Sequence, residues 1–445
     1  MPAETADDSF AVDVIVIGAG IGGLTIASEL ARRGYEVGVV EIGDHVGGSA
    51  VLSEGYVWTA LDEDAFLNED PDGDASKFLA MRAELFEALA ELEGRGIEVG
   101  PVLENVLGFG TGRQLDIGRY IDHCTRVVES AGGWVLLEHE VESLVTRSGA
   151  VTGVVVRDPE GATEPIAARA VVIATGGFQG SPQLRSEFIG PWASDLLLRA
   201  NPASIGGGVE LGRSVGAALS LGGDGFYGHL VPYPLDRWDP SNYTALSQYH
   251  SDEGVLLSRE GQRFADEAHG DHVNAQEVAK VGRALLFIDD ELWQRRGAAV
   301  FIPGMPALDK VRDAVEIGAH VSVADNLAEL VAPVASWGFD ADATLASLTE
   351  VQRTATGPRG SALRQPPFAL MEVQSAITFT LGGLSTGVHG QVLNEAGGTV
   401  PGLWAAGVDA GGLNVRGYTG GLVRGLVLGR ITARAIDAAL QRDER

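Results

Sequence analysis

The stretch Asp13-Val-Ile-Val-Ile-Gly-Ala-Gly-Ile-Gly-Gly23 decides the fold of this chain. The β-branched run from Val14 to Ile17 predicts a strand buried on both faces, and the apolar spacing from Leu24 to Arg33 predicts a helix. Between them lies the pattern Gly18-x-Gly20-x-x-Gly23. Its glycines permit in turn a tight bend, close approach of a pyrophosphate to the backbone, and close packing of the helix on the strand. The N-terminus of the helix then faces the anion.

A second predicted strand, Tyr35 to Val40, ends in Glu41. From this position a carboxylate can accept hydrogen bonds from both hydroxyls of an adenosine ribose. A glycine pattern alone is weak evidence, because glycines also occur in ordinary turns. Here strand, glycines, helix, second strand and acid agree, so the sequence predicts a Rossmann-like dinucleotide-binding domain of the α/β class.

The length and charge of the chain restrict its number of domains and its kinds of partner. A chain of 445 residues with 45% hydrophobic content exceeds what one core usually supports, so we expect two domains. The 32 basic and 61 acidic residues give a net charge of −29, which repels nucleic acid and anionic membrane surfaces. The acids are spread along the chain, which favours a solvated surface, and we expect neither nucleic acid nor membrane as a partner.

The single cysteine and the N-terminal segment bear on location. Cys124 excludes an internal disulfide and a cysteine-ligated cluster, and it fits a reducing cytoplasm. Residues 1 to 11 lack the basic and apolar regions of a signal peptide, and no apolar run reaches membrane-spanning length. We therefore expect a cytoplasmic protein with a short frayed N-terminus and no membrane span.

Three further glycine-rich stretches occur along the chain. Gly47-Gly48-Ser49 suits a loop that crosses phosphates or a ring edge, and the strand from Ala170 ends in Thr175-Gly176-Gly177. Near the other end, Gly402 to Gly407 is followed by Tyr418-Thr-Gly420-Gly421, which opens a predicted helix to Ala439. Residues 75 to 95 and 116 to 130 read as scaffold helices, and 151 to 157 and 169 to 173 as scaffold strands.

Together these stretches resemble the FAD-binding signatures of flavoproteins with two dinucleotide-binding domains, and the resemblance implies FAD rather than NAD. Some flavoproteins carry a histidine just beyond the second glycine loop that bonds covalently to the flavin, but residues 49 to 55 contain none, so we expect non-covalent FAD. The residues to which the motifs assign cofactor contacts are Gly18, Gly20, Gly22, Gly23, Glu41, Gly47, Gly48, Ser49, Thr175, Gly176, Gly177, Gly407, Asp409, Gly420, Gly421 and Leu422.

Two more motifs narrow the resemblance. The stretch from Gly254 through Arg263-Phe264-Ala-Asp-Glu267 looks like the family's entry into a capping domain, and Ala376 to Leu384 looks like its exit. In order, the motifs resemble the fumarate reductase/succinate dehydrogenase flavoprotein superfamily over nearly the whole chain. Within it they look most like the branch with tricarballylate dehydrogenase and the 3-ketosteroid dehydrogenases. The resemblance implies an FAD-binding domain at 1–248 and 380–445 and an inserted α+β capping domain for the substrate at 249–379.

The chain departs from fumarate reductases at their substrate groups. Phe379 stands where their substrate-binding histidine would be, and Tyr418 and Trp293 stand where two arginines would be. The acid expected directly after Gly407 also comes one place late, as Asp409. We therefore do not expect a plain fumarate reductase.

The residues that remain suggest a related chemistry. Hydride transfer between a substrate carbon and flavin N5 leaves a proton to be moved at the neighbouring carbon, and that proton is acidic only beside a carbonyl or carboxylate. The matching tyrosine of the ketosteroid branch implies that Tyr418 polarises a substrate ketone, although a ring packed on the cofactor is the alternative. The family places its acid/base group where this chain has Glu267, His269, Asp271 and His272, each of which, taken singly, also suits an ordinary surface loop. Arg416 could clamp a carboxylate or pair with a surface acid, and Tyr249 and His250 are weaker candidates.

These observations predict an FAD-dependent dehydrogenase that desaturates a carbon pair next to the carbonyl of a cyclic ketone or keto acid. Its partners would be that small molecule and an electron acceptor such as oxygen, a quinone or a soluble carrier. Two alternatives stay open, the reduction of an activated alkene and a flavin-bearing electron-transfer subunit. The N-terminus of the helix at Gly420-Gly421 is expected to raise the electron affinity of the flavin, and Arg424 either adds to this effect or caps solvent.

Overall fold

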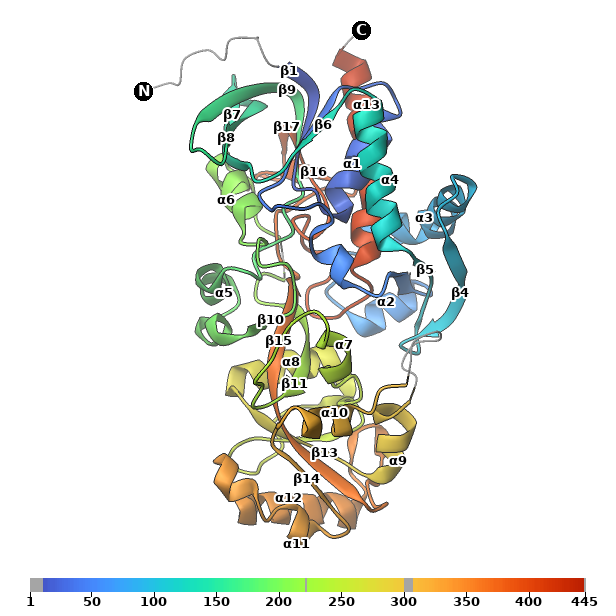
Figure 1. Cartoon of the computed structure of the whole chain (residues 1–445), viewed down its shortest axis with the longest axis vertical. Coiled ribbons are helices and arrows are strands. Elements are labelled where there is room, and N and C mark those ends of the chain that lie inside the picture. The colour runs from blue at the N-terminus through green and yellow to red at the C-terminus, as the bar shows by residue number, and fades with distance from the viewer. Residues whose placement is uncertain (1–10, 221, 300–306, 444–445) are drawn as a thin grey trace. The chain divides into compact units, whose positions relative to one another are not determined.

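The computed structural model describes residues 11–220, 222–299 and 307–443. The chain forms two compact units (Figure 1). The first unit comprises the chain up to Ile189, then Ala200–Gly225 and the part from Phe379 onward, and the second comprises Gly190–Arg199 and Phe226–Thr378.

The first unit is built on a mainly parallel sheet. Its path runs β16 (Gln391–Leu393), β17 (Thr399–Ala405), β9 (Thr163–Ile173), β1 (Ala11–Ile17), β2 (Val37–Val40) and β6 (Trp134–Leu136), and the hairpin β7 (Glu140–Arg147) and β8 (Ala150–Arg157) extends it beside β9. In the parallel register Val14 lies opposite Val37 on one side and Ala170 on the other. The β-branched run is fully buried because both neighbours and the covering helices exclude water.

Three helices of this unit lie side by side against the sheet: α1 (Ile21–Ala31), α4 (Ile117–Ser130) and α13 (Gly429–Asp443) (Figure 1). The Asp116 carboxylate caps α4 by accepting from the Arg119 amide, and Asp74 caps α3 (Ala75–Gly94) in the same way. The shorter elements are α2 (Glu63–Glu69), α5 (Pro182–Phe188), α6 (Gly207–Ser214) and a small sheet of β3 (Tyr56–Ala60), β5 (Gly110–Leu115) and β4 (Val99–Val106). The predicted scaffold helices are confirmed, and β9 begins earlier than expected because its first half pairs with β8.

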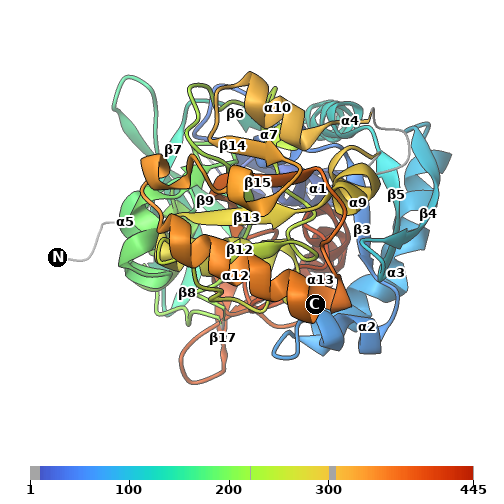
Figure 2. The same cartoon turned by 90° about the horizontal axis from the view of Figure 1, so that it is seen from below.

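The second unit has its own sheet, ordered β10 (Leu197–Leu198), β15 (Phe368–Thr380), β13 (Ala284–Ile288) and β12 (Val255–Leu257). Figure 2 shows β15, β13 and β12 side by side in this order. Two further strands, β11 (Phe226–Pro232) and β14 (Val321–Ala324), also pair with β15. The helices of this unit are α7 (Tyr243–Leu246), α8 (Asp271–Val281), α9 (Asp290–Leu292), α10 (Lys310–Glu316), α11 (Leu327–Leu330) and α12 (Ala341–Thr354).

The units differ from the domain boundaries that the motifs implied. Residues 226–248 belong with the second unit, because β11 pairs with β15 there, and residues 190–199 join it through β10, which runs parallel to β15. The N-terminal segment expected to be frayed lies, up to residue 10, outside the described residues, and β1 begins at Ala11. Within residues 11–220, 222–299 and 307–443, no helix has both the length and the apolar character needed to cross a membrane.

Candidate active site

The glycine motifs of the first unit, far apart in sequence, meet at the carboxyl ends of β1, β9 and β17. Gly18 has φ +103°, and a Cβ there would lie 2.3 Å from the Ala174 carbonyl oxygen at the end of β9. A Cβ at Gly22 in α1 would lie 3.3 Å from the Gly407 nitrogen, just after β17. Ligands of parallel α/β sheets bind at this edge, so the motifs converge where a dinucleotide site is expected.

The same edge of the sheet has open space beside its glycine loops. Counting the described part of the chain, a Cβ at Gly20 or Gly407 would have no atom within 4 Å, and one at Gly48 would meet only the Gly20 Cα at 3.4 Å. The Gly47 amide donates to the Ala19 carbonyl oxygen at 2.8 Å, which holds the second glycine loop on the first. Among the residues that the structure describes, no side chain caps α1 at its N-cap Gly20. Open space at an uncapped helix N-terminus fits a pyrophosphate.

Glu41 ties both loops to the end of β2. The buried carboxylate accepts from the Ala19 amide at 2.7 Å through Oε2 and from the Gly43 amide at 2.8 Å through Oε1. A carboxylate has about four acceptor positions, so two backbone bonds leave capacity for hydroxyl donors. The ribose contact of Glu41 stays a prediction, and the side chain has a structural role beside it.

Asp409 organises the loop after β9. It is fully buried and accepts from the Gly176 amide at 2.8 Å and from the Thr175 hydroxyl at 3.1 Å. Burial raises the pKa of this carboxyl, against the effect of the donors that face it. The one-place shift of this acid therefore leaves it bonded to the Thr175-Gly176 turn. Ser49 likewise holds backbone, since its hydroxyl accepts from the Asn201 amide at 3.0 Å.

Several buried polar atoms of the first unit lack a hydrogen-bond partner among the described residues. They include Gln179 Oε1 and Thr380 Oγ1, which lie beside Gly177, and Nε and Nη1 of Arg424. Arg424 is 1% exposed, and burial lowers its pKa to about 10, so the side chain does not cap solvent. Unsatisfied buried donors and acceptors of this kind suit a polar ring system. The open space at the glycine loops and these buried polar atoms together fit FAD.

The C-terminal helix begins at this site. Gly420 has φ +103°, and a Cβ there would lie 2.0 Å from the Trp58 carbonyl oxygen, so only glycine fits. Helical structure starts at Leu422 and passes through the π-helical turn η7 (Arg424–Leu428) into α13. Such turns are frequent at functional sites.

Tyr418 is half-buried directly before this helix. Its ring packs edge-on against Trp58 at 5.5 Å and lies 6.1 Å from Phe379, and its hydroxyl accepts from the Gly421 amide at 3.2 Å. The side chain of Arg416 is exposed, although its backbone amide donates to the buried Asp70. The structure thus brings Tyr418 and Phe379 together at the helix start, and the backbone amide of Arg416 is bonded to Asp70.

The four loop residues predicted as acid/base groups separate in the second unit. Glu267 is fully buried, accepts from the Leu256 amide in β12 at 3.0 Å and pairs with Arg263. His269 has a side chain that is 66% exposed, 3.7 Å from Asp266. Asp271 and His272 point inward at the start of α8, where His272 Nδ1 lies 3.7 Å from Asp271 Oδ1.

The partner of Asp271 is a residue that the sequence analysis missed. Nδ1 of the buried His229 lies 2.7 Å from Asp271 Oδ2, and His229 Nε2 lies 2.9 Å from the Tyr227 hydroxyl. Burial lowers the pKa of His229 to about 4, and the two histidines hold the pKa of Asp271 well below its usual range. The pattern Tyr227-Gly-His229 places both side chains on one face of a strand, and this period of two was the signal that could have identified them.

Two cations lie close to these residues. The Tyr249 ring packs edge-on against His229 at 4.7 Å, and the Tyr249 hydroxyl accepts from Arg199 Nη2 at 3.2 Å. Lys310 Nζ lies 4.6 Å from the centre of the same ring, and burial lowers its pKa to about 7. His250 is also buried, but neither of its ring nitrogens has a hydrogen-bond partner among the described residues.

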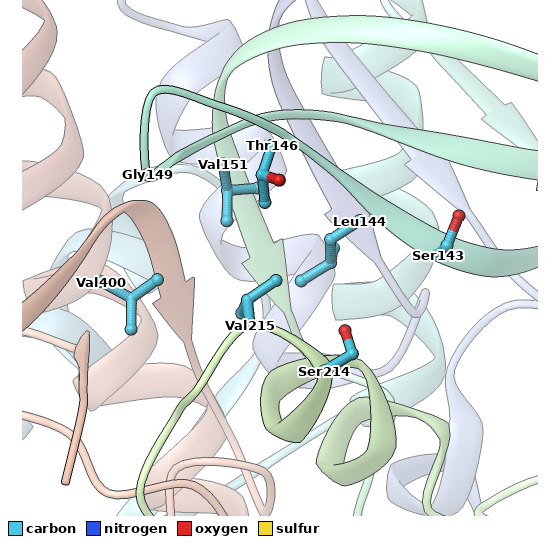
Figure 3. A pocket seen from close by; sticks show the side chains of 8 residues that line it. All are labelled: Ser143, Leu144, Thr146, Gly149, Val151, Ser214, Val215 and Val400. Carbon is cyan, nitrogen blue, oxygen red and sulfur yellow. The ribbon is translucent and has the colours of Figure 1, made fainter. Parts of the chain in front are cut away.

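A separate hollow of about 550 Å³ opens between the β7–β8 hairpin, the end of α6 and β17 (Figure 3). Its lining is aliphatic side chains and hydroxyls, with no acid, base or aromatic ring: Ser143, Leu144, Thr146, Gly149, Val151, Ser214, Val215 and Val400. None of the cofactor motifs contributes to it, so we do not assign it to the active site.

Comparison with known proteins identifies the family. A family model described as an FAD binding domain matches residues 13–93 and 122–421. A 3-oxosteroid 1-dehydrogenase of Mycobacterium tuberculosis is 27% identical over 67% of this chain and 58% of its own length. An NADH:acrylate oxidoreductase of Vibrio harveyi is 25% identical over 71% of this chain and 32% of its own length. The chain therefore spans between about a third and three-fifths of these relatives.

Solved structures share the fold. The 3-ketosteroid-Δ4-(5α)-dehydrogenase of Rhodococcus jostii RHA1 superposes with a TM-score of 0.74 at 21% identity, over 97% of both chains. A flavocytochrome c3 fumarate reductase superposes with a TM-score of 0.69 at 19% identity, over 97% of this chain and 79% of that one. These structures confirm the α/β class, and the family model with the curated relatives confirms the resemblance that the motifs carry. The chain belongs to the FAD binding domain family, in the fumarate reductase/succinate dehydrogenase flavoprotein superfamily, and its cofactor is FAD.

Proposed function

We propose that this protein is an FAD-dependent oxidoreductase that desaturates a carbon–carbon bond next to the carbonyl group of a cyclic ketone or keto acid. The family supports the cofactor, and its curated relatives include enzymes named 3-oxosteroid 1-dehydrogenase. The substrate class rests on the groups that this chain has at the start of its C-terminal helix.

The observation that carries the proposal is the pair of Tyr418 and Phe379. Both are uncharged, their rings lie 6.1 Å apart, and the phenol oxygen accepts from the Gly421 amide. A hydroxyl that accepts one hydrogen bond becomes a stronger donor through its own proton. Such a phenol stabilises the charge that builds up on a ketone oxygen as the adjacent carbon loses a proton. Two uncharged rings do not clamp a dicarboxylate, which disfavours fumarate as substrate.

When bound, FAD supplies the hydride acceptor of the reaction at flavin N5. The chain supplies positive charge to favour reduction: the N-terminal amides of the helix that begins at Leu422, and the buried guanidinium of Arg424 within its first turns. The acceptor that takes the electrons onward, whether oxygen, a quinone or a soluble carrier, stays a prediction, as does a cytoplasmic location.

A second candidate is the reduction of an activated alkene, because an NADH:acrylate oxidoreductase and fumarate reductases are also among the relatives. The two candidate functions differ in the compound that should react with the oxidised flavin and in the compound that should react with the reduced flavin. Saturated ketones should bleach the oxidised flavin if the protein is a dehydrogenase. Acrylate or fumarate should reoxidise the reduced flavin faster than any enone if it is an alkene reductase.

The experiment is an anaerobic titration of the FAD-loaded protein with saturated cyclic ketones, keto acids and dicarboxylates. We expect a member of the first two groups to bleach the visible flavin absorbance and to yield an α,β-unsaturated product. Bleaching by succinate alone, or by no compound in the panel, would contradict the proposed substrate class.

A further inference from the structure

Two positively charged side chains of the second unit have no acid beside them. Arg199, directly after β10, is half-buried, and Lys310, the first residue of α10, is 1% exposed. In the part of the chain that the structure describes, no carboxylate oxygen lies within 4 Å of either side chain. The other described arginines of this unit that are not exposed, Arg283 and Arg296, each form an ion pair with an acid, at 2.6 and 2.7 Å. Buried charges in proteins are normally paired, so the missing partner of Arg199 and Lys310 calls for an explanation.

Both cations contact Tyr249. Arg199 Nη2 donates to the Tyr249 hydroxyl at 3.2 Å, and Lys310 Nζ lies 4.6 Å from the centre of the ring. Arg199 Nη1 also donates to the Thr378 hydroxyl at 3.4 Å, and its buried Nε has no hydrogen-bond partner among the described residues. A guanidinium has five N–H donors, so these two neutral acceptors leave most of its capacity for an anion.

The position of Arg199 is fixed without a counter-ion. Its backbone amide donates to the Ile377 carbonyl oxygen of β15 at 2.8 Å, and its guanidinium carbon lies 5.6 Å from the centre of the Tyr243 ring. Tyr243 is the first residue of α7, which lies beside α10 (Figures 1 and 2). An arginine that is already oriented by backbone pairing and by an aromatic ring loses little side-chain freedom when it binds an anion.

The charge of Lys310 responds to its surroundings. Burial lowers the pKa of Lys310 to about 7, Arg199 lowers it further, and Asp313 on the same helix and Asp271 on α8 oppose the shift. The uncharged ring of Tyr249 and the buried His250 also face it. Near pH 7 the amine is therefore partly neutral, and an anion bound close by would raise its pKa and its positive charge.

We propose that Arg199, Tyr249 and Thr378 bind the carboxylate group of a small molecule, and that Lys310 adds positive charge from the interior. The planar fork of a guanidinium matches the two oxygens of a carboxylate, and the Thr378 hydroxyl, which accepts from Arg199, has a proton of its own to donate. Arg199 and Tyr249 are half-buried, so a ligand can reach them, whereas Lys310 is covered and acts through its charge. The site lies within the second unit and does not depend on the proposed dehydrogenation.

The test measures binding of benzoate, cyclohexanecarboxylate and pyruvate to the oxidised, FAD-loaded protein by isothermal titration calorimetry. The uncharged amides of the same three acids are the matched probes. At least one carboxylate should bind ten times more tightly than its amide. Binding of no carboxylate, or equal binding of acid and amide, would overturn the proposal. Tighter binding of inorganic phosphate than of any carboxylate would overturn the ligand class.

Substitutions locate the binding site. Arg199→Gln should weaken carboxylate binding roughly 10- to 150-fold, the range for hydrogen bonds to a charged group. In wild type the affinity should fall by up to about tenfold per pH unit above pH 7, as Lys310 loses its proton, and Lys310→Met should remove this dependence. Without ligand, both variants should melt no lower than wild type, because no acid loses its partner. A lower melting temperature in both variants would show a structural pair of cations instead of a binding site.

Two further variants serve as controls. Arg312→Gln removes an exposed arginine of α10 that pairs with Glu316 at 3.4 Å, and it should bind the carboxylate like wild type. Arg416→Gln removes the arginine of the first unit that the sequence analysis considered as a carboxylate clamp. Unchanged affinity in Arg199→Gln, or a loss in Arg416→Gln alone, would overturn the site in the second unit.

The flavin spectrum distinguishes two sources of the carboxylate. A carboxylate that binds at Arg199 and bleaches the flavin is a substrate, and the substrate class narrows to keto acids. One that binds at Arg199 without bleaching is a separate ligand of the enzyme. A flavin that no ketone or keto acid bleaches contradicts the proposed function alone, whereas unchanged carboxylate binding in Arg199→Gln contradicts this inference alone.

Discussion

Replacing Tyr418 by phenylalanine removes one hydroxyl group and keeps the ring. The ring contacts with Trp58 at 5.5 Å and Phe379 at 6.1 Å remain, so the cofactor site keeps its shape. The lost group is the hydroxyl, which accepts from the Gly421 amide at 3.2 Å. Removing a single donor to a developing oxyanion costs roughly 10²- to 10³-fold in rate, or about 2.7–4 kcal/mol. We expect this loss in flavin reduction, with a change in FAD affinity of less than about tenfold, which is ~1.4 kcal/mol.

The assay is anaerobic stopped-flow reduction of FAD-saturated protein at saturating ketone. Tyr35→Phe is a matched control in the same unit, because it removes a hydroxyl that donates to Asp437 on α13 at 2.8 Å, and Tyr35 is not among the residues to which the motifs assign cofactor contacts. The control should reduce at the wild-type rate. If Tyr418→Phe also does so, the phenol has no part in polarising the carbonyl. If it chiefly loses FAD instead, the ring is a packing element of the cofactor site.

Three further predictions concern the cofactor and the buried histidine. Acid precipitation should release the flavin into the supernatant, since residues 49–55 contain no histidine, and colour retained by proteolytic peptides would show a covalent link. Glu41→Ala should weaken FAD binding by about 1.5–3 kcal/mol in titrations of apo-protein. It should also lower the melting temperature of the apo-protein, because the Ala19 and Gly43 amides lose their acceptor. Unchanged FAD affinity would place Glu41 outside the ribose site. Burial lowers the pKa of His250 to about 3, below its unfolded value of about 6.5. Between these two pH values the unfolded state binds more protons than the folded state. The free energy of unfolding therefore falls as the pH falls, by up to ~1.4 kcal/mol per pH unit. His250→Leu should remove that loss when melting temperatures at pH 7 and pH 5 are compared, and equal losses in variant and wild type would show that His250 does not titrate as inferred.

The cofactor motifs of the first unit could be predicted from the sequence because their signals are local. Gly18 and Gly420 both have φ +103° and backbone atoms of other segments where a Cβ would be, so these positions need glycine for reasons that the motif itself expresses. Glu41 follows its strand directly, and the helix after Gly421 starts where the glycine pair predicts. Each of these features depends on a few neighbouring residues.

The cluster of His229 and Asp271 in the second unit could not be predicted in the same way, because it depends on packing between distant segments. His229 and Asp271 are separated by 42 positions and meet only because α8 packs against β11. Nothing local distinguishes Asp271, which turns inward, from His269, which stays exposed. The pairing of β11 with β15, which places β11 in the second unit, likewise joins segments far apart in the sequence.

The most direct test of the proposed function is a single anaerobic turnover of FAD-loaded protein with a deuterated saturated cyclic ketone. One sample carries deuterium at both α-carbons, next to the carbonyl, and a second sample carries it at the β-carbons, one position further away. The proposed dehydrogenation predicts one enone formed for each flavin bleached, with an isotope effect on bleaching from the hydride-donating carbon and loss of the α-deuterium to solvent. A bleached flavin without enone, or an enone formed without bleaching, would contradict it.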